Sequence, residues 1–337
     1  MSDQLLSVAG LRVEFSTERG TIYAVNGVSF AIAEGETLGI VGESGCGKSV
    51  TALALLGILA RAGRVAEGSA MFDGRDLLDM SDRELRKVRG KDIGMIFQDP
   101  MTSLNPVHTI GAQIHEALTA HFDMSSKEAN ARVVELLDQV GIPSAKSRAA
   151  DYPHQFSGGM RQRAMIAMAL ACEPKLLIAD EPTTALDVTI QAQILDLLRA
   201  LVADRGTALI LITHDLGVVA GMCERVNVMY AGTLVETGTA AQVFAHPRHP
   251  YTLGLLQSVP RLDVGRQLAL QPIPGQPRNM LSPPSACPFA PRCRYRVEVC
   301  TEELPILRSH GHDHLAACFN PVEADEWRRM RAAGRAV

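Results

Sequence analysis

The chain has 337 residues, of which 47% are hydrophobic and 21% charged, and it carries a formal net charge of −4 with a pI near 6.2. This length allows two domains, or one large domain with an appendage, and the acidic balance argues against a nucleic-acid-binding protein, which usually carries a basic stripe. No apolar run approaches the ~18 residues that span a bilayer. The first residues lack a charged leader before an apolar stretch, so we expect no secretory signal and a cytosolic chain.

The opening segment predicts antiparallel strands. Leu11–Phe15 alternates between apolar and polar residues, and two further strand-like runs, Thr21–Val25 and Val28–Ile32, follow a turn. Tyr23 lies in the first of these two runs. From its spacing alone, a tyrosine here is as consistent with packing in a strand as with stacking on an adenine ring.

A glycine-rich segment then follows the short apolar run Leu38–Val41 and precedes a second apolar run that begins at Thr51. It fits the phosphate-loop pattern G-x-x-x-x-G-K-[ST] at every fixed position. The segment consists of Gly42, Glu43, Ser44, Gly45, Cys46, Gly47, Lys48 and Ser49, followed by Val50. Successive backbone N–H groups of such a loop point at phosphate oxygens, aided by the positive end of the next helix. We therefore predict an ATP site in which Lys48 reaches the β- and γ-phosphates and Ser49 binds Mg²⁺.

The middle of the chain predicts an inserted helical subdomain at about residues 100–165. An apolar strand from Ile93 ends at Gln98, and two proline steps then punctuate the chain. Residues 110–140 show the apolar spacing of helices. At the start of a further helical run, Ser157 is predicted as an N-cap. Gly158 and Gly159, followed by Met160, would let the backbone approach an anion closely.

Two later runs predict parallel strands that are covered on both faces. Lys175–Ala179 ends in Asp180 and Glu181, and Thr207–Thr213 ends at His214. Because ligands of open α/β sheets lie at the carboxyl ends of the strands, we expect these side chains beside the phosphate loop. Asp180 would orient Mg²⁺, and Glu181 would accept a proton from an attacking water.

With these motifs in order, residues 1–245 resemble the nucleotide-binding subunit of an ABC transporter. The resemblance implies an α/β fold with a RecA-like P-loop core, an antiparallel β subdomain and a helical subdomain. It also implies a role for each matching residue: adenine stacking for Tyr23, Mg²⁺ and water sensing for Gln98, the signature for Ser157–Met160, Mg²⁺ binding for Asp180, the catalytic base for Glu181, an interface loop for Ala185–Asp187, and the switch histidine for His214.

Two features narrow the resemblance within that family. Met160 stands where the general signature has glutamine, and this variant is similar to the branch that imports oligopeptides and dipeptides. Twelve of the eighteen prolines lie from Pro247 onward, and this part resembles the extension of peptide and nickel importers. We therefore expect residues 246–337 to form a C-terminal extension and the chain to energise peptide import. An importer of nickel or another solute of the same branch is the alternative.

The resemblance also implies partners and a location. In this family two cassettes enclose two ATP molecules head to tail, so a lone chain should be a poor ATPase. The implied complex contains a second ATPase subunit, usually a related paralogue that gives a heterodimer, two membrane permease subunits and an extracytoplasmic peptide-binding protein. The chain would then lie on the cytoplasmic face of the membrane.

Four of the seven cysteines cluster near the end of the chain, as Cys287, Cys293, Cys300 and Cys318. Four thiolates could bind a [4Fe–4S] cluster or Zn²⁺. The spacing lacks the Cys-x2-Cys pairs of zinc ribbons, and the peptide-importer branch is similar in having an iron–sulfur tail, so a cluster is favoured over zinc and over free thiols. The nearby His310, His312 and His314 are alternative ligands or part of a solvated polar loop.

Two functions of other classes remain as alternatives. A soluble ABC ATPase that acts on nucleic acid or ribosomes usually has tandem cassettes, coiled-coil insertions or basic patches, and this sequence has none. A regulatory module that binds ATP without hydrolysis would not need Glu181 and His214.

Overall fold

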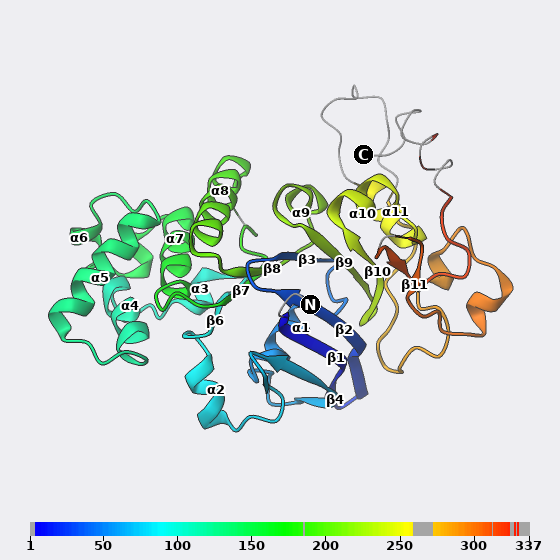
Figure 1. Cartoon of the computed structure of the whole chain (residues 1–337), viewed down its shortest axis with the longest axis horizontal. Helices are drawn as coiled ribbons and strands as arrows, with labels where there is room; N and C mark the ends of the chain where they lie inside the picture. The colour runs from blue at the N-terminus through cyan, green and yellow to red at the C-terminus, as the bar shows by residue number, and fades with distance from the viewer. Residues whose placement is uncertain are drawn as a thin grey trace. The chain divides into compact units, whose positions relative to one another are not determined.

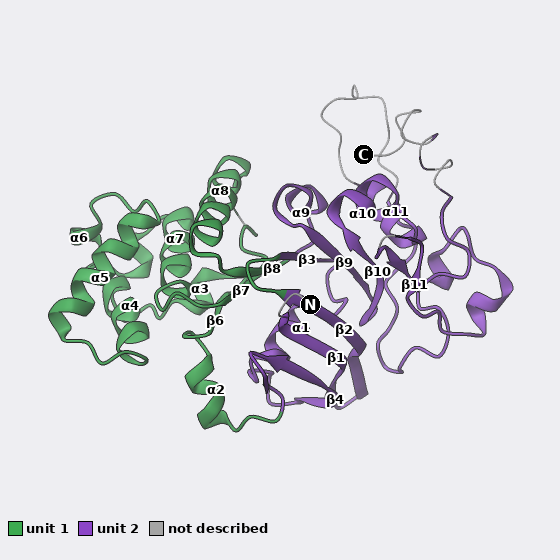
Figure 2. Ribbon diagram, viewed as in Figure 1, with its two compact units in different colours: residues 1–3, 33–36, 79–211 green, residues 4–32, 37–78, 212–337 purple. Residues whose placement is uncertain are grey.

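The computed structural model describes residues 4–184, 186–258, 272–311, 313–323, 327 and 329. Ala185, His312 and the stretch 259–271 of the C-terminal extension lie outside the described residues. Figure 1 shows the helices and strands in chain order, and Figure 2 shows the two compact units into which the chain divides. Unit 1 comprises residues 33–36 and 79–211, and unit 2 comprises residues 4–32, 37–78 and 212–337.

Unit 2 contains two sheets, of which the first has the strand order β2-β1-β4-β5. Its strands are β1 (Gln4–Thr17), β2 (Gly20–Ala33), β4 (Gly63–Phe72) and β5 (Arg75–Asp76). The predicted strands at the start of the chain are confirmed, but the two runs after the turn form one continuous strand, β2. The two runs meet at the Asn-Gly step of residues 26–27. There the N–H of Asn26 donates to the carbonyl of Gly232, and the strand continues without a break.

The second sheet of unit 2 has the order β11-β12-β10-β9-β3. β3 (Thr37–Val41) runs parallel to β9 (Arg225–Tyr230), and the remaining pairs are antiparallel. The outer strands are β10 (Thr233–Thr239), β12 (Leu315–Ala316) and β11 (Arg308–Ser309). Residues after 246 therefore extend the sheet that contains the strand before the phosphate loop.

Helices cover both sheets of unit 2. α1 contacts β1 and β4 of the first sheet, α9 contacts β3, and α10 contacts β9 and β10. The helical segments are α1 (Lys48–Leu55), α9 (Leu216–Met222), α10 (Ala240–Ala245) and α11 (Pro250–Gln257), with 3₁₀ turns η2 (Ala290–Arg292) and η3 (Glu298–Thr301). α11 lies in the C-terminal extension that is expected over residues 246–337.

Unit 1 combines a strand group, β8-β7-β6, with a helical layer around α7 (Figure 2). β6 (Ile93–Ile96) and β7 (Leu176–Asp180) are parallel, and β8 (Ala208–Thr213) continues into unit 2. The helices are α2 (Asp82–Val88), α3 (Pro100–Ser103), α4 (Ile110–Thr119), α5 (Ser126–Gln139), α6 (Ala145–Arg148), η1 (Pro153–Gln155), α7 (Gly158–Ala169) and α8 (Val188–Arg205).

The helical spacing predicted over residues 110–140 is confirmed by α4 and α5. All their buried residues are apolar except Gln113, whose side chain forms hydrogen bonds with the backbone of Asn105 and His108. α7 packs against α3, α4, α5, α8 and β6, so it is the central helix of unit 1. In the ranges that the structure describes, no helix has the length and apolarity needed to cross a bilayer.

A buried polar cluster lies at the start of α11. Glu236 is fully buried, accepts the backbone N–H groups of Arg248 and His249, and lies 2.7 Å from the Nε2 atom of His314. His249 is the N-cap of α11, and its Nδ1 atom accepts the N–H of Tyr251. Burial lowers the pKa of His249 to about 4, although Glu236 acts in the opposite direction. His314 is thus part of a buried cluster rather than of a solvated loop.

We predict that His249 makes the stability of unit 2 depend on pH. The folded state keeps His249 neutral, whereas the unfolded state binds a proton below a pKa of 6.5. Stability therefore falls between pH 6.5 and about 4, by at most about 1.4 kcal/mol per pH unit. Urea unfolding followed by the fluorescence of Trp327, the single and buried tryptophan, measures this slope.

The matched control is His249→Asn, because asparagine keeps an acceptor at the N-cap but does not titrate. The slope of this variant should be smaller than that of the parent chain in the same pH range. Identical slopes for the two proteins would contradict the role assigned to His249.

Candidate functional site

The phosphate loop lies between β3 and α1 and is packed against backbone from other strands. A Cβ atom on Gly42 would lie 2.2 Å from the carbonyl oxygen of Met229, and one on Gly47 would lie 2.5 Å from that of Ala24. Both distances are shorter than any real Cβ contact, so only glycine fits at these two positions. The N–H of Gly232 donates to the carbonyl of Cys46. The loop is therefore fixed from both sides, by β2 and by the turn between β9 and β10.

Lys48 is the positively charged group of this loop. Its side chain is buried, and its Nζ atom donates to the carbonyls of Gly42 at 2.8 Å and Glu43 at 3.1 Å. Burial raises the pKa of the Cys46 thiol, against the opposing effect of Lys48. The thiol thus stays neutral and does not cancel the ammonium charge. Ser49 and Val50 are half-buried in the first turn of α1, while Ser44 and Gly45 are exposed.

Two further predicted site residues lie in unit 2. Tyr23 is half-buried in β2, directly before Ala24, whose carbonyl faces Gly47. His214 is exposed at the end of β8, and the following residue, Asp215, caps α9. The structure therefore places Tyr23 one residue from the wall of the phosphate loop, and His214 on the loop that joins a buried strand to a helix.

Unit 1 brings together the predicted water-sensing residue and the predicted base. The Nε2 atom of Gln98 donates to Oε2 of Glu181 at 2.9 Å, and the hydroxyl of Thr184 donates to the same oxygen at 2.9 Å. Asp180 is buried at the end of β7. Glu181 has a φ of +45°, which is unusual for a residue other than glycine and typical of functional sites. Two donors and a strained backbone therefore fix the orientation of this carboxylate.

The signature residues form the N-terminus of α7. The hydroxyl of Ser157 accepts the N–H of Met160, which confirms the predicted N-cap. Ser157 and Gly158 are exposed, whereas a Cβ atom on Gly159 would lie 2.8 Å from the Cγ2 atom of Ile190 on α8. The second glycine is thus required by the packing of α7 on α8, and the first presents its backbone to solvent beside the positive end of the helix.

The structure does not show the metal site that the sequence predicts at the four clustered cysteines. Among the described residues, no group of three or more His, Cys, Asp or Glu side chains is arranged to hold a metal ion. The other three thiols nevertheless lie near enough to Cys318 to raise its pKa. Burial raises the pKa of Cys293 to about 11 and that of Cys318 to about 12.

Sequence analysis missed the residues that hold Glu43. The carboxylate of this phosphate-loop residue binds the guanidinium of Arg292, and its N–H donates to the hydroxyl of Tyr251. Burial raises the pKa of Tyr251, so its hydroxyl stays neutral. The partners are separated from Glu43 by 249 and 208 residues, and no local pattern reports such a contact.

Comparison with known proteins places these motifs in a family. The model described as "ABC transporter" matches residues 25–184, and the one described as "Oligopeptide/dipeptide transporter, C-terminal region" matches residues 235–300. The chain is 56% identical to the oligopeptide transport ATP-binding protein OppD of Escherichia coli, over 96% of this chain and 95% of that protein. It is 54% identical to the dipeptide transport ATP-binding protein DppD of Bacillus subtilis, over 94% and 95% of the two chains.

Solved structures agree with this assignment. The dimeric ATP-binding cassette MJ0796, bound to ADP and phosphate, is 30% identical, with a TM-score of 0.63 over 70% of this chain and 98% of that one. The CbiO1 protein of Clostridium perfringens, part of an ABC transporter complex, is 31% identical, with a TM-score of 0.62 over 72% and 92%. The predicted α/β fold of a P-loop ABC cassette is thereby confirmed. The chain belongs to the ABC transporter family, among the ATP-binding proteins of its oligopeptide and dipeptide branch.

Proposed function

We propose that this chain is the ATP-hydrolysing subunit of a membrane complex that imports oligopeptides or dipeptides. The observation that carries the proposal is the 56% identity to an oligopeptide transport ATP-binding protein across 96% of the chain. This likeness includes the C-terminal region as well as the cassette. A cassette alone would support ATP hydrolysis, and the match of residues 235–300 to the oligopeptide/dipeptide family model supports peptides as the transported solute.

The residues of the candidate site support a division of labour in hydrolysis. Lys48 and the loop amides would bind the β- and γ-phosphates, while Ser49 and Asp180 would hold Mg²⁺. Glu181 would take a proton from the attacking water, which then adds to the γ-phosphorus as ADP leaves. The hydrogen bond from Gln98 and the one from Thr184 support this role, because they orient the carboxylate before the substrate binds. His214 would complete the site beside the γ-phosphate.

We predict that Glu181→Gln preserves nucleotide binding and lowers turnover by about 100-fold or more, because an amide cannot accept the proton. Phosphate release and binding of Mg²⁺–ATP measure the two effects separately. Glu135→Gln is the matched control, since Glu135 is an exposed glutamate on α5. Wild-type turnover in Glu181→Gln would remove this residue as the base.

The exposed start of α7 supports a dimeric arrangement. Ser157 and Gly158 offer a hydroxyl and a backbone donor to solvent, and a related cassette of known structure is dimeric. We propose that these donors complete the ATP site of a second ATPase subunit, whether a copy or a paralogue.

Exposed apolar side chains of unit 1, at Met101, Val107 and Tyr152, are suited to contact the permease subunits at the cytoplasmic face of the membrane.

The test of the transport function is the ATPase rate of the complex reconstituted with its permease subunits and binding protein. We predict that peptide-loaded binding protein raises this rate above that with unloaded binding protein, because the transported solute triggers closure of the cassettes. Lys48→Ala in the same complex gives the background rate. Stimulation by nickel-loaded but not by peptide-loaded binding protein would show a nickel importer and contradict the peptide assignment.

We further propose that the four clustered thiols bind an iron–sulfur cluster, with Zn²⁺ as the alternative ion. Backbone N–H groups support this proposal, because they act against burial and lower the pKa of three of the four thiols: those of Phe289 and Ala290 act on Cys287, that of Tyr295 on Cys293, and that of Asn320 on Cys318. Such hydrogen bonds stabilise thiolates and tune metal–thiolate centres. When bound, the group would cross-link a lobe with little regular secondary structure.

We predict that protein purified without oxygen is brown and contains iron and acid-labile sulfide. Replacing Cys293 with serine should remove the colour, because a thiolate ligand is lost. Cys172→Ser is the matched control, since this buried cysteine lies in unit 1. Colourless protein with one zinc per chain would establish the alternative ion, and protein without any metal would leave four free thiols.

A further inference from the structure

A salt bridge ties the phosphate loop to the C-terminal extension within unit 2. The Nη1 and Nη2 atoms of Arg292 bind Oε2 and Oε1 of Glu43 at 2.6 and 2.9 Å. This two-point geometry is the strongest form of the arginine–carboxylate pair. The Arg292 side chain is only 5% exposed, and that of Glu43 is 26% exposed. Solvent therefore screens this pair much less than a surface ion pair.

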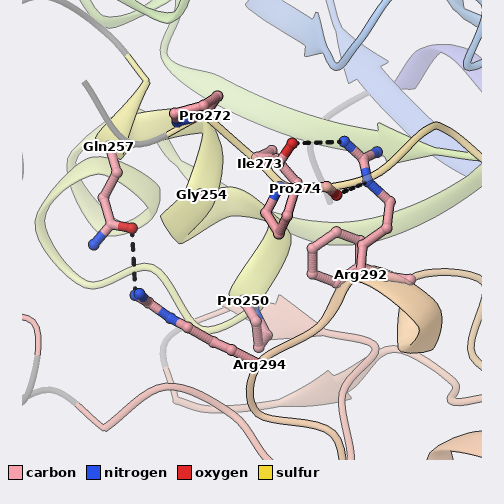
Figure 3. A pocket seen from close by; sticks show the side chains of 9 residues that line it. Pro250, Gly254, Gln257, Pro272, Ile273, Pro274, Arg292 and Arg294 are labelled. Carbon is pink, nitrogen blue, oxygen red and sulfur yellow. Dashed lines mark hydrogen bonds between the residues drawn. The ribbon is translucent and has the colours of Figure 1, made fainter. Parts of the chain in front are cut away.

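The guanidinium of Arg292 is itself held in place. Its Nε atom donates to the carbonyl of Pro274 at 2.8 Å, and Nη2 lies 3.4 Å from the carbonyl of Ile273 (Figure 3). The guanidinium carbon lies 5.8 Å from the ring centroid of Tyr230 and 6.0 Å from that of Phe289. Arg294, two residues later, donates instead to Gln257 on α11, and these two side chains line the same pocket as Arg292 (Figure 3). Arg292 thus reaches Glu43 with most of its rotational freedom already removed.

The backbone of Glu43 has a second anchor in the extension. Its N–H donates to the hydroxyl of Tyr251 at 2.7 Å. Tyr251 is fully buried and packs against Tyr230 and Phe289, with ring centroids 4.7 and 5.4 Å apart. Both the side chain and the main chain of Glu43 are therefore fixed by residues that follow position 246.

A third contact reaches the strand that carries the predicted adenine-stacking residue. The N–H of Tyr23 donates to the carbonyl of Met280 at 2.8 Å. Pro277, Arg278 and Met280 line a small cleft together with Ser44–Cys46 of the phosphate loop. Residues 277–280 thus lie beside residues 43–46 of the phosphate loop and reach β2 at Tyr23.

We propose that Arg292 is a positioning residue of the nucleotide site, through which the C-terminal extension sets the affinity for ATP. Arg292 neutralises a carboxylate that belongs to the phosphate-binding loop itself. Without this partner, the negative charge of Glu43 would repel the incoming phosphates, and the loop would lose its lateral support. The inference rests on the proposed role of the loop in binding nucleotide.

The test is a titration of the full chain with Mg²⁺–ADP, which is not hydrolysed. We expect Arg292→Gln to raise the Kd about tenfold, within the usual range of coupling between sites. Arg292→Lys should give a smaller rise, because lysine keeps the charge but loses the two-point geometry. The double variant Glu43→Gln/Arg292→Gln should recover most of the wild-type affinity, because it removes the unpaired carboxylate.

The dependence on salt separates electrostatic positioning from general damage to the fold. Repulsion between Glu43 and phosphate weakens as ions screen it, so the ratio of Kd values between Arg292→Gln and wild type should shrink as KCl is raised. Damage to packing would give a ratio that does not change with salt, and the double variant would not recover. Either result would overturn the proposal.

Two control variants distinguish a failure of the Arg292 proposal from a failure of the phosphate-loop assignment. Arg294→Gln should bind Mg²⁺–ADP like wild type, because Arg294 is exposed and contacts Gln257. Lys48→Ala should lose binding, and if it does not, the phosphate-loop assignment fails. If Lys48→Ala loses binding while both Arg292 variants match wild type, only the present proposal fails. If Arg292→Gln does not fold, Arg292→Lys carries the test. A Kd above that of wild type supports the proposal, and a wild-type Kd overturns it.

Discussion

The nucleotide site depends on backbone packed directly against backbone. The glycines at the two ends of the phosphate loop lie where a single methyl group would collide with the carbonyls of Met229 and Ala24. These carbonyls belong to two different strands, so the loop can form only when both strands are in place. The buried ammonium of Lys48 then bonds to the loop's own carbonyls. The geometry of this anion site is thus a property of the folded unit 2 rather than of the eight motif residues alone.

A second constraint acts at the carboxyl ends of β6 and β7. Glu181 adopts a left-handed backbone conformation that costs free energy for a residue with a side chain. Its carboxylate accepts from both Gln98 and Thr184. These bonds offset part of the cost and keep the side chain in one rotamer. A group that must receive a proton at a fixed point gains from such preorganisation, because little movement is then needed during the reaction.

The sequence predicts most of the fold because its signals are local. The glycine spacing of the phosphate loop, the buried run before Asp180 and the serine that caps α7 each depend on a few neighbouring residues. The pairing of Gln98 with Glu181 spans 83 residues, and it is within reach of prediction because both residues follow strands of one sheet. The two-residue strands β11 and β12 leave no period to detect, and the Asn-Gly step at residues 26–27 hides the continuity of β2. The spacing of the cysteines fixes the ligand type but not whether the sulfurs converge.

The contact between Glu43 and Arg292 changes how the chain can be divided. The drop in regular pattern after residue 246 suggests a convenient place to cut, yet side chains from beyond that point brace the loop at residues 42–47. A truncated cassette would expose Tyr230 and leave an acidic side chain without its counterion. Chimeras that exchange C-terminal extensions between paralogous subunits therefore need to take Glu43 and Arg292 from the same parent.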